Sequence, residues 1–167
     1  MSHNQMSKDA YLQLSEGLNS NTCLTDLFFT HNDLQAAGEG GIAFIKTLAN
    51  KKDLKSLAIN SCNLNGSYLE ELKNAIQDQV SLKELYLFAN KIESEGAKFI
   101  SLMIQNKQGL TSIGLSNNKL GAIGAAELAK NGLQGKRGLI KISIENNSII
   151  NVGLKAISLA LSDCSQI

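Results

Sequence analysis

The stretch LTSIGLSNNKL, from Leu110 to Leu120, is the clearest copy of a pattern that runs through the chain. The pattern is Leu-x-x-Leu-x-Leu-x-x-Asn-x-Leu, with other apolar residues replacing some leucines. Four further copies are LTDLFFTHNDL at 24–34, LKSLAINSCNL at 54–64, LKELYLFANKI at 82–92 and LIKISIENNSI at 139–149. Successive copies begin 30, 28, 28 and 29 residues apart. A nearly constant period of this length indicates a repeat architecture.

Each repeat changes its hydrophobic period along its length. Apolar residues alternate with others at the end of the motif, as in Leu57-x-Ile59, which predicts a short strand with one face buried. The segment that follows has apolar residues at helical spacing, as at Ala97, Ile100 and Ile104. The sequence therefore predicts five parallel strands, each followed by a helix, whose stacking creates the core.

Residues 1–23 precede the five copies. Leu14 and Leu18 stand before Leu24 as Phe44 and Leu48 stand before the next copy, which predicts a helix within 8–18. We expect this helix to cap the first repeat and the first several residues to be disordered. No proline or long polar linker interrupts the chain, so we expect a single domain over 1–167, with five repeats over 24–167.

A glycine recurs four residues after the motif in four repeats, at Gly38, Gly96, Gly124 and Gly153. Together the motif, its period and this glycine-led helix resemble the leucine-rich repeat family, and the longer period resembles the ribonuclease-inhibitor subtype. The resemblance implies an α/β fold, a curved solenoid with parallel strands on the concave face and helices on the convex face. It also implies that the protein binds other proteins, without specifying which.

The asparagine position of the motif forms a column that reads Asn32, Cys62, Asn90, Asn118 and Asn147. An amide can both donate to and accept from the backbone of successive turns, so this column is expected to be structural. If Cys62 were a nucleophile, it would need a basic partner. The candidate is His31, which lies in the neighbouring repeat. A buried structural thiol is the favoured interpretation of Cys62.

Non-leucine positions of the strands are expected to face outward on the concave side. Core packing does not demand Phe28, Tyr86 and Phe88 at such positions. Phe28 and Tyr86 would flank Ala58 at about 10 Å from one another, forming a slot for a partner. In the alternative, the aromatic rings cover one another or pack under the N-terminal segment. The predicted partner-binding residues are Phe28, Thr30, His31, Asn60, Tyr86, Phe88 and Glu145.

Basic residues recur in the turns that lead from each helix to the next strand. We expect them to line one edge of the molecule as a basic rim that steers an acidic partner, unless they are simply solvated loop lysines. The rim comprises Lys51, Lys52, Lys107, Lys136 and Arg137.

Composition argues against several functions. Sixteen basic and 15 acidic residues give a net charge of +1, unlike a general nucleic-acid-binding protein. His3, His31 and three scattered cysteines have no zinc-site spacing, and no nucleophile and base converge. We therefore expect no enzymatic activity, no cofactor and no metal. Modulation of a GTPase remains an alternative that no residue specifies.

The start of the chain lacks an apolar signal-peptide core, and three cysteines make an odd count, so we expect a soluble cytoplasmic protein. Delivery into another cell as an effector stays open. Cys164 stands fourth from the end, as in a prenylation signal, but Ser165 and Gln166 are polar where aliphatic residues are usual. Lipidation at Cys164 is thus a weakly supported alternative.

The chain ends at Ile167, one residue before a sixth motif would begin. We expect the last strand and helix to present an open side. Self-association through this C-terminal end, giving a homo-oligomer, is the second hypothesis beside binding of a protein partner.

Overall fold

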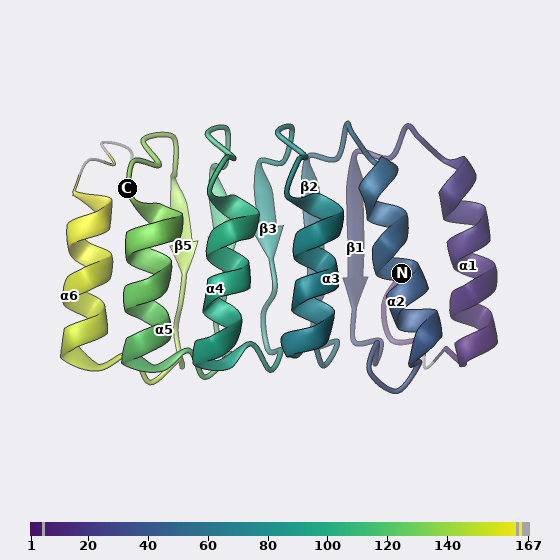
Figure 1. Cartoon of the computed structure of the whole chain (residues 1–167), viewed down its shortest axis with the longest axis horizontal. Helices are drawn as coiled ribbons and strands as arrows, with labels where there is room; N and C mark the ends of the chain where they lie inside the picture. Colours follow the sequence, from purple (N-terminus) through teal and green to yellow (C-terminus); the bar gives the residue numbers. More distant parts are fainter. Residues whose placement is uncertain (5, 163, 165–167) are drawn as a thin grey trace.

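The computed structural model describes residues 1–4, 6–162 and 164, and it consists of one sheet and one row of helices (Figure 1). The sheet is parallel, and its strands follow one another in chain order. All the described helices lie on the same side of it, so the other side is uncovered; we call it the open sheet face. The strands are β1 (Asp26–Thr30), β2 (Ser56–Asn60), β3 (Glu84–Tyr86), β4 (Ser112–Gly114) and β5 (Lys141–Ser143).

A helix precedes β1 and a helix follows every strand. Lys8–Ser20 forms α1, as expected for the segment before the first motif, and Ser7 caps it by accepting from Ala10 N–H. The others are α2 (Glu39–Lys46) with the 3₁₀ turn η1 (Thr47–Asn50), α3 (Gly66–Ile76), α4 (Glu93–Ile104), α5 (Gly121–Glu127) with the π-helical turn η2 (Leu128–Leu133), and α6 (Ile150–Leu161).

Strand register aligns the motif copies position by position. The second leucine of each motif pairs with its counterpart across the sheet, as Leu57 does with Leu27 and Leu85. These side chains point toward the helices and are at most 3% exposed in the first four strands. The alternation of the strands therefore separates a buried face from the open sheet face, as the period of two predicts.

The asparagine column forms a ladder of hydrogen bonds behind the strands. Asn118 Oδ1 accepts from Asn90 N–H at 2.9 Å, and its Nδ2 donates to Leu87 O and Leu115 O, both at 2.8 Å. Asn147 Oδ1 accepts from Asn118 N–H in the same way. These bonds satisfy backbone groups that the ends of short strands leave without partners. The structural interpretation of the column is thereby supported.

Residues 1–4 are ordered against β1, whereas we expected the first several residues to be disordered. Ser2 pairs in parallel with Thr30, and Asn4 N–H donates to Asn32 Oδ1 at 2.9 Å. Ser2-His3-Asn4 lies 28 residues before Thr30-His31-Asn32, which it resembles. The segment therefore contains the second half of a motif copy, and its backbone covers the edge of β1.

Length differences between repeats are absorbed outside the strands. The repeat that begins at Leu110 is one residue longer than its predecessor, and its helix continues as the π-helical turn η2, which accommodates an extra residue. In the longest repeat, residues 34–38 form turns before α2, and Gly38 has a φ of 54°. The strands consequently keep their register.

Candidate functional site

The open sheet face carries a row of outward residues, one from each strand. The register places Phe28, Ala58, Tyr86, Gly114 and Ser143 side by side, as predicted from the motif. Phe28 is 52% exposed, although it stands in a strand. Ala58 beside it is 3% exposed and offers a flat apolar floor. Exposed aromatic area next to a small residue is the kind of place where a partner side chain can be anchored.

Tyr86 and Phe88 form a stacked pair rather than one wall of a slot. Their ring centroids are 5.7 Å apart and their planes differ by 19°. Both rings lie over Gly114, where an added Cβ would collide with them. Mutual covering, the alternative weighed from the sequence, therefore applies to this pair, and both side chains are half-buried. Phe28 remains the aromatic side chain with the most open surface on this face.

The polar residues predicted for the same surface have different local roles. Asn60 Oδ1 accepts from Phe88 N–H at 2.8 Å, so this amide supports the neighbouring loop. The ring of His31 stacks on His3 with centroids 4.1 Å apart, and Thr30 O accepts from His3 N–H. Both Thr30 and His31 thus contact the N-terminal segment.

Glu145 lies just beyond β5, at the other end of the sheet from Phe28. It is exposed, and Ser116 Oγ donates to its carboxylate. This hydrogen bond lowers the pKa of Glu145, and Lys141 contributes through its charge. The predicted residues therefore form one face but not one cluster.

A shallow hollow adjoins His31 where β1 and β2 end, which the sequence did not reveal. Asn63 Nδ2 donates across it to Asp33 Oδ2 at 2.6 Å. Its lining mixes apolar and polar side chains: Met6, His31, Asp33, Ala36, Ser61 and Asn63. The hollow extends the open sheet face toward the loops.

The predicted basic rim is wrong for three of its five members. Lys51, Lys107 and Lys136 are at most 2% exposed. The ammonium group of each donates to backbone carbonyls at the end of a preceding helix: Lys51 to Leu18 O at 2.8 Å, Lys107 to Ile76 O at 2.7 Å, and Lys136 to Gln105 O at 2.7 Å. Because the last carbonyls of a helix lack internal donors, these lysines act as caps.

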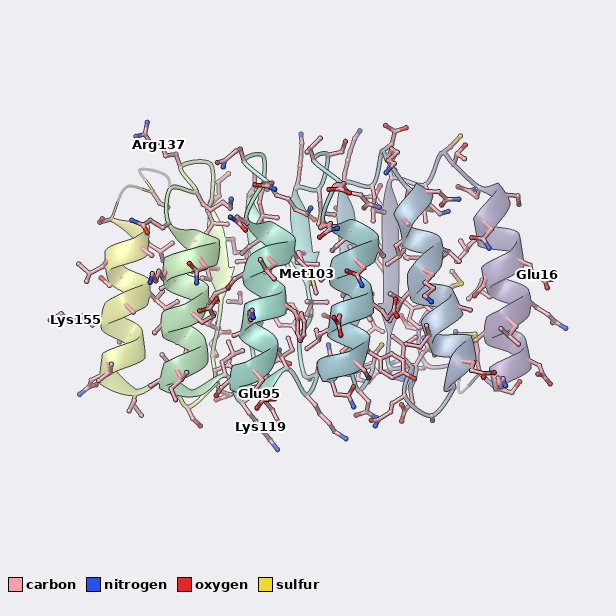
Figure 2. The ribbon with its side chains drawn as sticks, viewed as in Figure 1. Glu16, Glu95, Met103, Lys119, Arg137 and Lys155 are labelled. Carbon is pink, nitrogen blue, oxygen red and sulfur yellow. The ribbon has the colours of Figure 1, made fainter. Side chains whose placement is uncertain are left out.

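Burial has an electrostatic consequence for the capping lysines. Loss of hydration lowers the pKa of Lys107 to about 8, and it lowers the pKa of Lys51 and of Lys136. Lys52 and Arg137 are exposed, and Arg137 projects from the turn before β5 (Figure 2). Two isolated charges are too few to make a basic strip.

Neither of the two buried cysteines has the surroundings of a reactive thiol. Burial raises the pKa of Cys62 to about 11, and its Sγ donates to Asn60 O at 3.1 Å and Phe29 O at 3.3 Å. Cys164 is 7% exposed, and its Sγ donates to Lys136 O at 3.1 Å. A lipid on Cys164 would have to displace this packing, which argues against modification in the folded state. Residues 165–167 of the suggested signal lie outside the described part.

Metal-ligand groups and membrane-spanning helices are both absent from the described residues. Within 1–4, 6–162 and 164, no three or more histidine, cysteine or carboxylate side chains are grouped as metal ligands. Over the same residues, no helix is both long and apolar enough to cross a membrane.

Comparison with known proteins supports leucine-rich repeats as the class of this protein. A family model described as "Leucine Rich repeat" matches residues 80–101, which contain the third motif copy. Among solved structures, the tropomodulin C-terminal domain of Caenorhabditis elegans superposes with a TM-score of 0.65. The match covers 92% of each chain at 14% identity, so it concerns the fold alone.

Three relatives show sequence similarity over most of the chain. "NACHT, LRR and PYD domains-containing protein 4E" of Mus musculus is 31% identical over 66% of this chain. "NACHT, LRR and PYD domains-containing protein 13" of Homo sapiens is 27% identical over 70%, and "NLR family CARD domain-containing protein 4" of Bos taurus is 32% identical over 60%. The matches span only 10–11% of those much longer proteins.

Proposed function

We propose that this chain is a non-enzymatic module of a single domain that binds a protein partner on its open sheet face. We further propose that this face is the concave side of a curved solenoid of the ribonuclease-inhibitor-like subtype. Adjacent strands lie about 4.8 Å apart, whereas packed helices need 8–10 Å. Stacking the two layers in parallel therefore bends the sheet inward.

The exposure of Phe28 carries this proposal. Its ring is 52% exposed beside the buried Ala58, and the stacked Tyr86 and Phe88 lie across the next strand. Apolar and aromatic surface in the centre of a patch, with polar groups around it, is the usual anatomy of a binding hot spot. Here the polar groups beside Phe28 are Thr30, His31 and Asn60, at the ends of β1 and β2, whereas Glu145 lies on the same face beyond β5.

The size of the face restricts the partner. Four strand spacings and three outward residues per strand give about 20 by 10 Å, below the roughly 800 Å² that each partner buries in a standard interface. A single helix or loop of a partner protein matches these dimensions.

The proposed location of the chain is the cytoplasm. Cys23, Cys62 and Cys164 are free, which is consistent with a reducing compartment.

Affinity purification with quantitative mass spectrometry tests the proposed function. Phe28→Ala and Tyr86→Ala should each deplete the same captured protein at least about fivefold, since truncating a hot-spot aromatic costs more than about 1 kcal/mol. Leu102→Ala is the matched control, because Leu102 is 40% exposed and lies on α4, on the helix side. Thermal unfolding should be nearly unchanged in Phe28→Ala. Unaltered capture by the double variant Phe28→Ala/Tyr86→Ala would refute binding through this face.

A further inference from the structure

The two ends of the molecule differ in polarity. At the N-terminal end, α1 exposes polar side chains such as Lys8, Asp9, Gln13 and Glu16, and residues 1–4 cover the edge of β1. At the other end, α6 and β5 form the outermost pair of elements among the described residues (Figure 1). Lys155 is the one charged residue of α6.

The C-terminal end exposes a cross-section of the core. Ile142 and Ile144 are only partly buried, while Ile113 and Leu115, one repeat earlier, are fully buried. Leu154 is 58% exposed, whereas Ala125, at the same place in the preceding helix, is 0% exposed. We call this surface the tail face: Ile142, Ile144, Ile149, Leu154 and Leu161.

The backbone at this end is also prepared for a further strand. Leu115 N–H donates to Ser143 O at 2.7 Å, and Asn117 N–H donates to Glu145 O at 2.9 Å. One repeat on, the N–H groups of Ile144 and Asn146 point the same way, and no strand lies beyond β5 in the described residues. Such an edge is a template for pairing with another chain.

We propose that two copies of the chain associate tail face to tail face about a two-fold axis at Ser143, with β5 pairing antiparallel to its counterpart. The polar N-terminal end does not complement the apolar tail face, so a second tail face is the matching surface. A two-fold contact is self-complementary by symmetry, as most homodimer contacts are. This association uses the free edge of β5 and the tail face, and it leaves Phe28, Tyr86 and Phe88 of the open sheet face uncovered.

The charges at β5 select this arrangement. Antiparallel pairing centred on Ser143 sets Lys141 opposite the partner subunit's Glu145, and Glu145 opposite the partner subunit's Lys141. Opposite charges on directly facing residues stabilise an antiparallel pair. A lysine on an edge strand normally discourages pairing with foreign strands. In the proposed dimer, the charge of Lys141 is compensated by the partner subunit's Glu145.

The hydrogen-bond pattern fits the same axis. The backbone groups of Ile142 and Ile144 lie at the free edge of β5. The two-fold axis sets Ile142 opposite the partner subunit's Ile144, and Ile144 opposite the partner subunit's Ile142. Residues of such a pair exchange both N–H···O bonds, so the dimer gains four bonds and a sheet continuous through both copies. Ile142 and Ile144 of both copies then point to one shared core beside the two α6 helices.

The contact is small, which sets the expected affinity. A helix of 12 residues is about 18 Å long and the two layers are about 20 Å thick, giving about 360 Å² per copy and about 720 Å² in total. This lies below the size of a standard specific interface, so the dimer should be weak, reversible and dependent on concentration. Lys155 projects from α6 at this end (Figure 2), and its like charge in a second copy weakens the contact further.

Sedimentation equilibrium of the purified chain tests the proposal without any partner present. We expect a monomer–dimer equilibrium with a Kd on the order of 1–100 µM at low salt, weakening as salt is added. Lys141→Glu and Glu145→Lys should each raise the dimer Kd at least about fivefold, because like charges then face one another. Lys55→Glu is the control. Lys55 is exposed and lies just before β2, which is not an edge strand of the sheet.

Charge reversal distinguishes this geometry from other associations. The double variant Lys141→Glu/Glu145→Lys should regain the wild-type Kd, and an equal mixture of the two single variants should form the heterodimer. Circular dichroism verifies that each variant is folded, and the mixture remains informative if one is less stable. A strict monomer at about 500 µM overturns the proposal. So does a dimer that the single reversals leave unchanged, or one that neither the double variant nor the mixture restores.

Discussion

Cys62 is the one residue that interrupts the asparagine column. Asn90 Oδ1 accepts from both Cys62 N–H and Leu64 N–H, which shows how one amide serves a neighbouring turn. The side chain of Cys62 has no amide oxygen that could accept from Asn32 N–H in the same way, and its thiol is a weak donor. The column is therefore weakest between the first and second repeats.

Cys62→Asn should raise the free energy of unfolding by about 1 kcal/mol, because the amide replaces weak thiol bonds with ordinary hydrogen bonds. Urea unfolding measures the change, with Cys23→Asn as the control because Cys23 is exposed. A loss of stability in Cys62→Asn would mean that this turn has no room for the amide. The repeat-to-repeat equivalence of the column would then fail at this position.

At the scale of elements, helix ends are tied to the next repeat by one side chain. Lys51, Gln79, Lys107 and Lys136 are spaced by 28, 28 and 29 residues and occupy one position of the repeat. Gln79 Nε2 donates to Leu48 O, as the lysines donate to the ends of other helices. An uncharged amide thus performs the same capping role in one repeat.

Lys107→Met should lower the free energy of unfolding by about 2 kcal/mol at pH 7, because it leaves Ile76 O and Gln77 O buried without the ammonium donor. Lys107→Gln should retain more of the stability, since Gln79 provides the precedent for an amide at this position. Chemical denaturation of both variants checks the order. Equal stability of wild type and Lys107→Met would contradict the capping role.

The same lysine predicts a pH dependence. Burial lowers the pKa of Lys107 from 10.5 to about 8, so above pH 8 the folded state loses a proton that the unfolded state keeps. The free energy of unfolding of the wild type should therefore rise by about 1 kcal/mol between pH 8 and 9, relative to Lys107→Met. Below about pH 7 the difference should be flat. Taking the difference removes the opposing contribution of Cys62, whose pKa is raised.

At the scale of the whole molecule, the N-terminal end is covered by the chain itself. Met1 O accepts from Asn32 Nδ2 at 3.0 Å, and the N-terminal amine donates to Phe28 O at 2.8 Å. Residues 1–4 thereby provide Asn32 with hydrogen-bond partners, as the preceding repeat does for the later asparagines of the column. The segment closes the sheet without contributing a complete strand.

Deleting residues 1–4 should lower the free energy of unfolding by about 1–2 kcal/mol, through lost hydrogen bonds and an uncovered edge of β1. Urea unfolding measures the loss, and light scattering should detect aggregation through the freed edge. Asn4→Ala is the control, because its backbone N–H still reaches Asn32. A deletion variant as stable and soluble as the wild type would show that the segment does not protect the edge.

The motif predicted the strands, their order and the outward rows, because leucine periodicity reports burial directly. It did not predict that Tyr86 and Phe88 stack over Gly114, since side-chain direction depends on the residue present on the adjacent strand. Lys107 was misread because charged residues are rarely fully buried. The recurrence of Lys51, Gln79, Lys107 and Lys136 at one phase was the available signal. The pairing of Ser2-His3-Asn4 with β1 was not predicted, because this partial motif copy lacks the leucines by which the other copies are recognised.

The π-helical turn η2 has a consequence for how such a chain can vary over evolutionary time. An extra residue at Leu128–Leu133 changes the outer layer and leaves the pairing of Ser112 with Lys141 in place. Insertions and deletions in the helices are thus uncoupled from substitutions on the strands. A lineage can therefore change its repeat lengths freely while selection tunes Phe28 and its neighbours for a partner one side chain at a time.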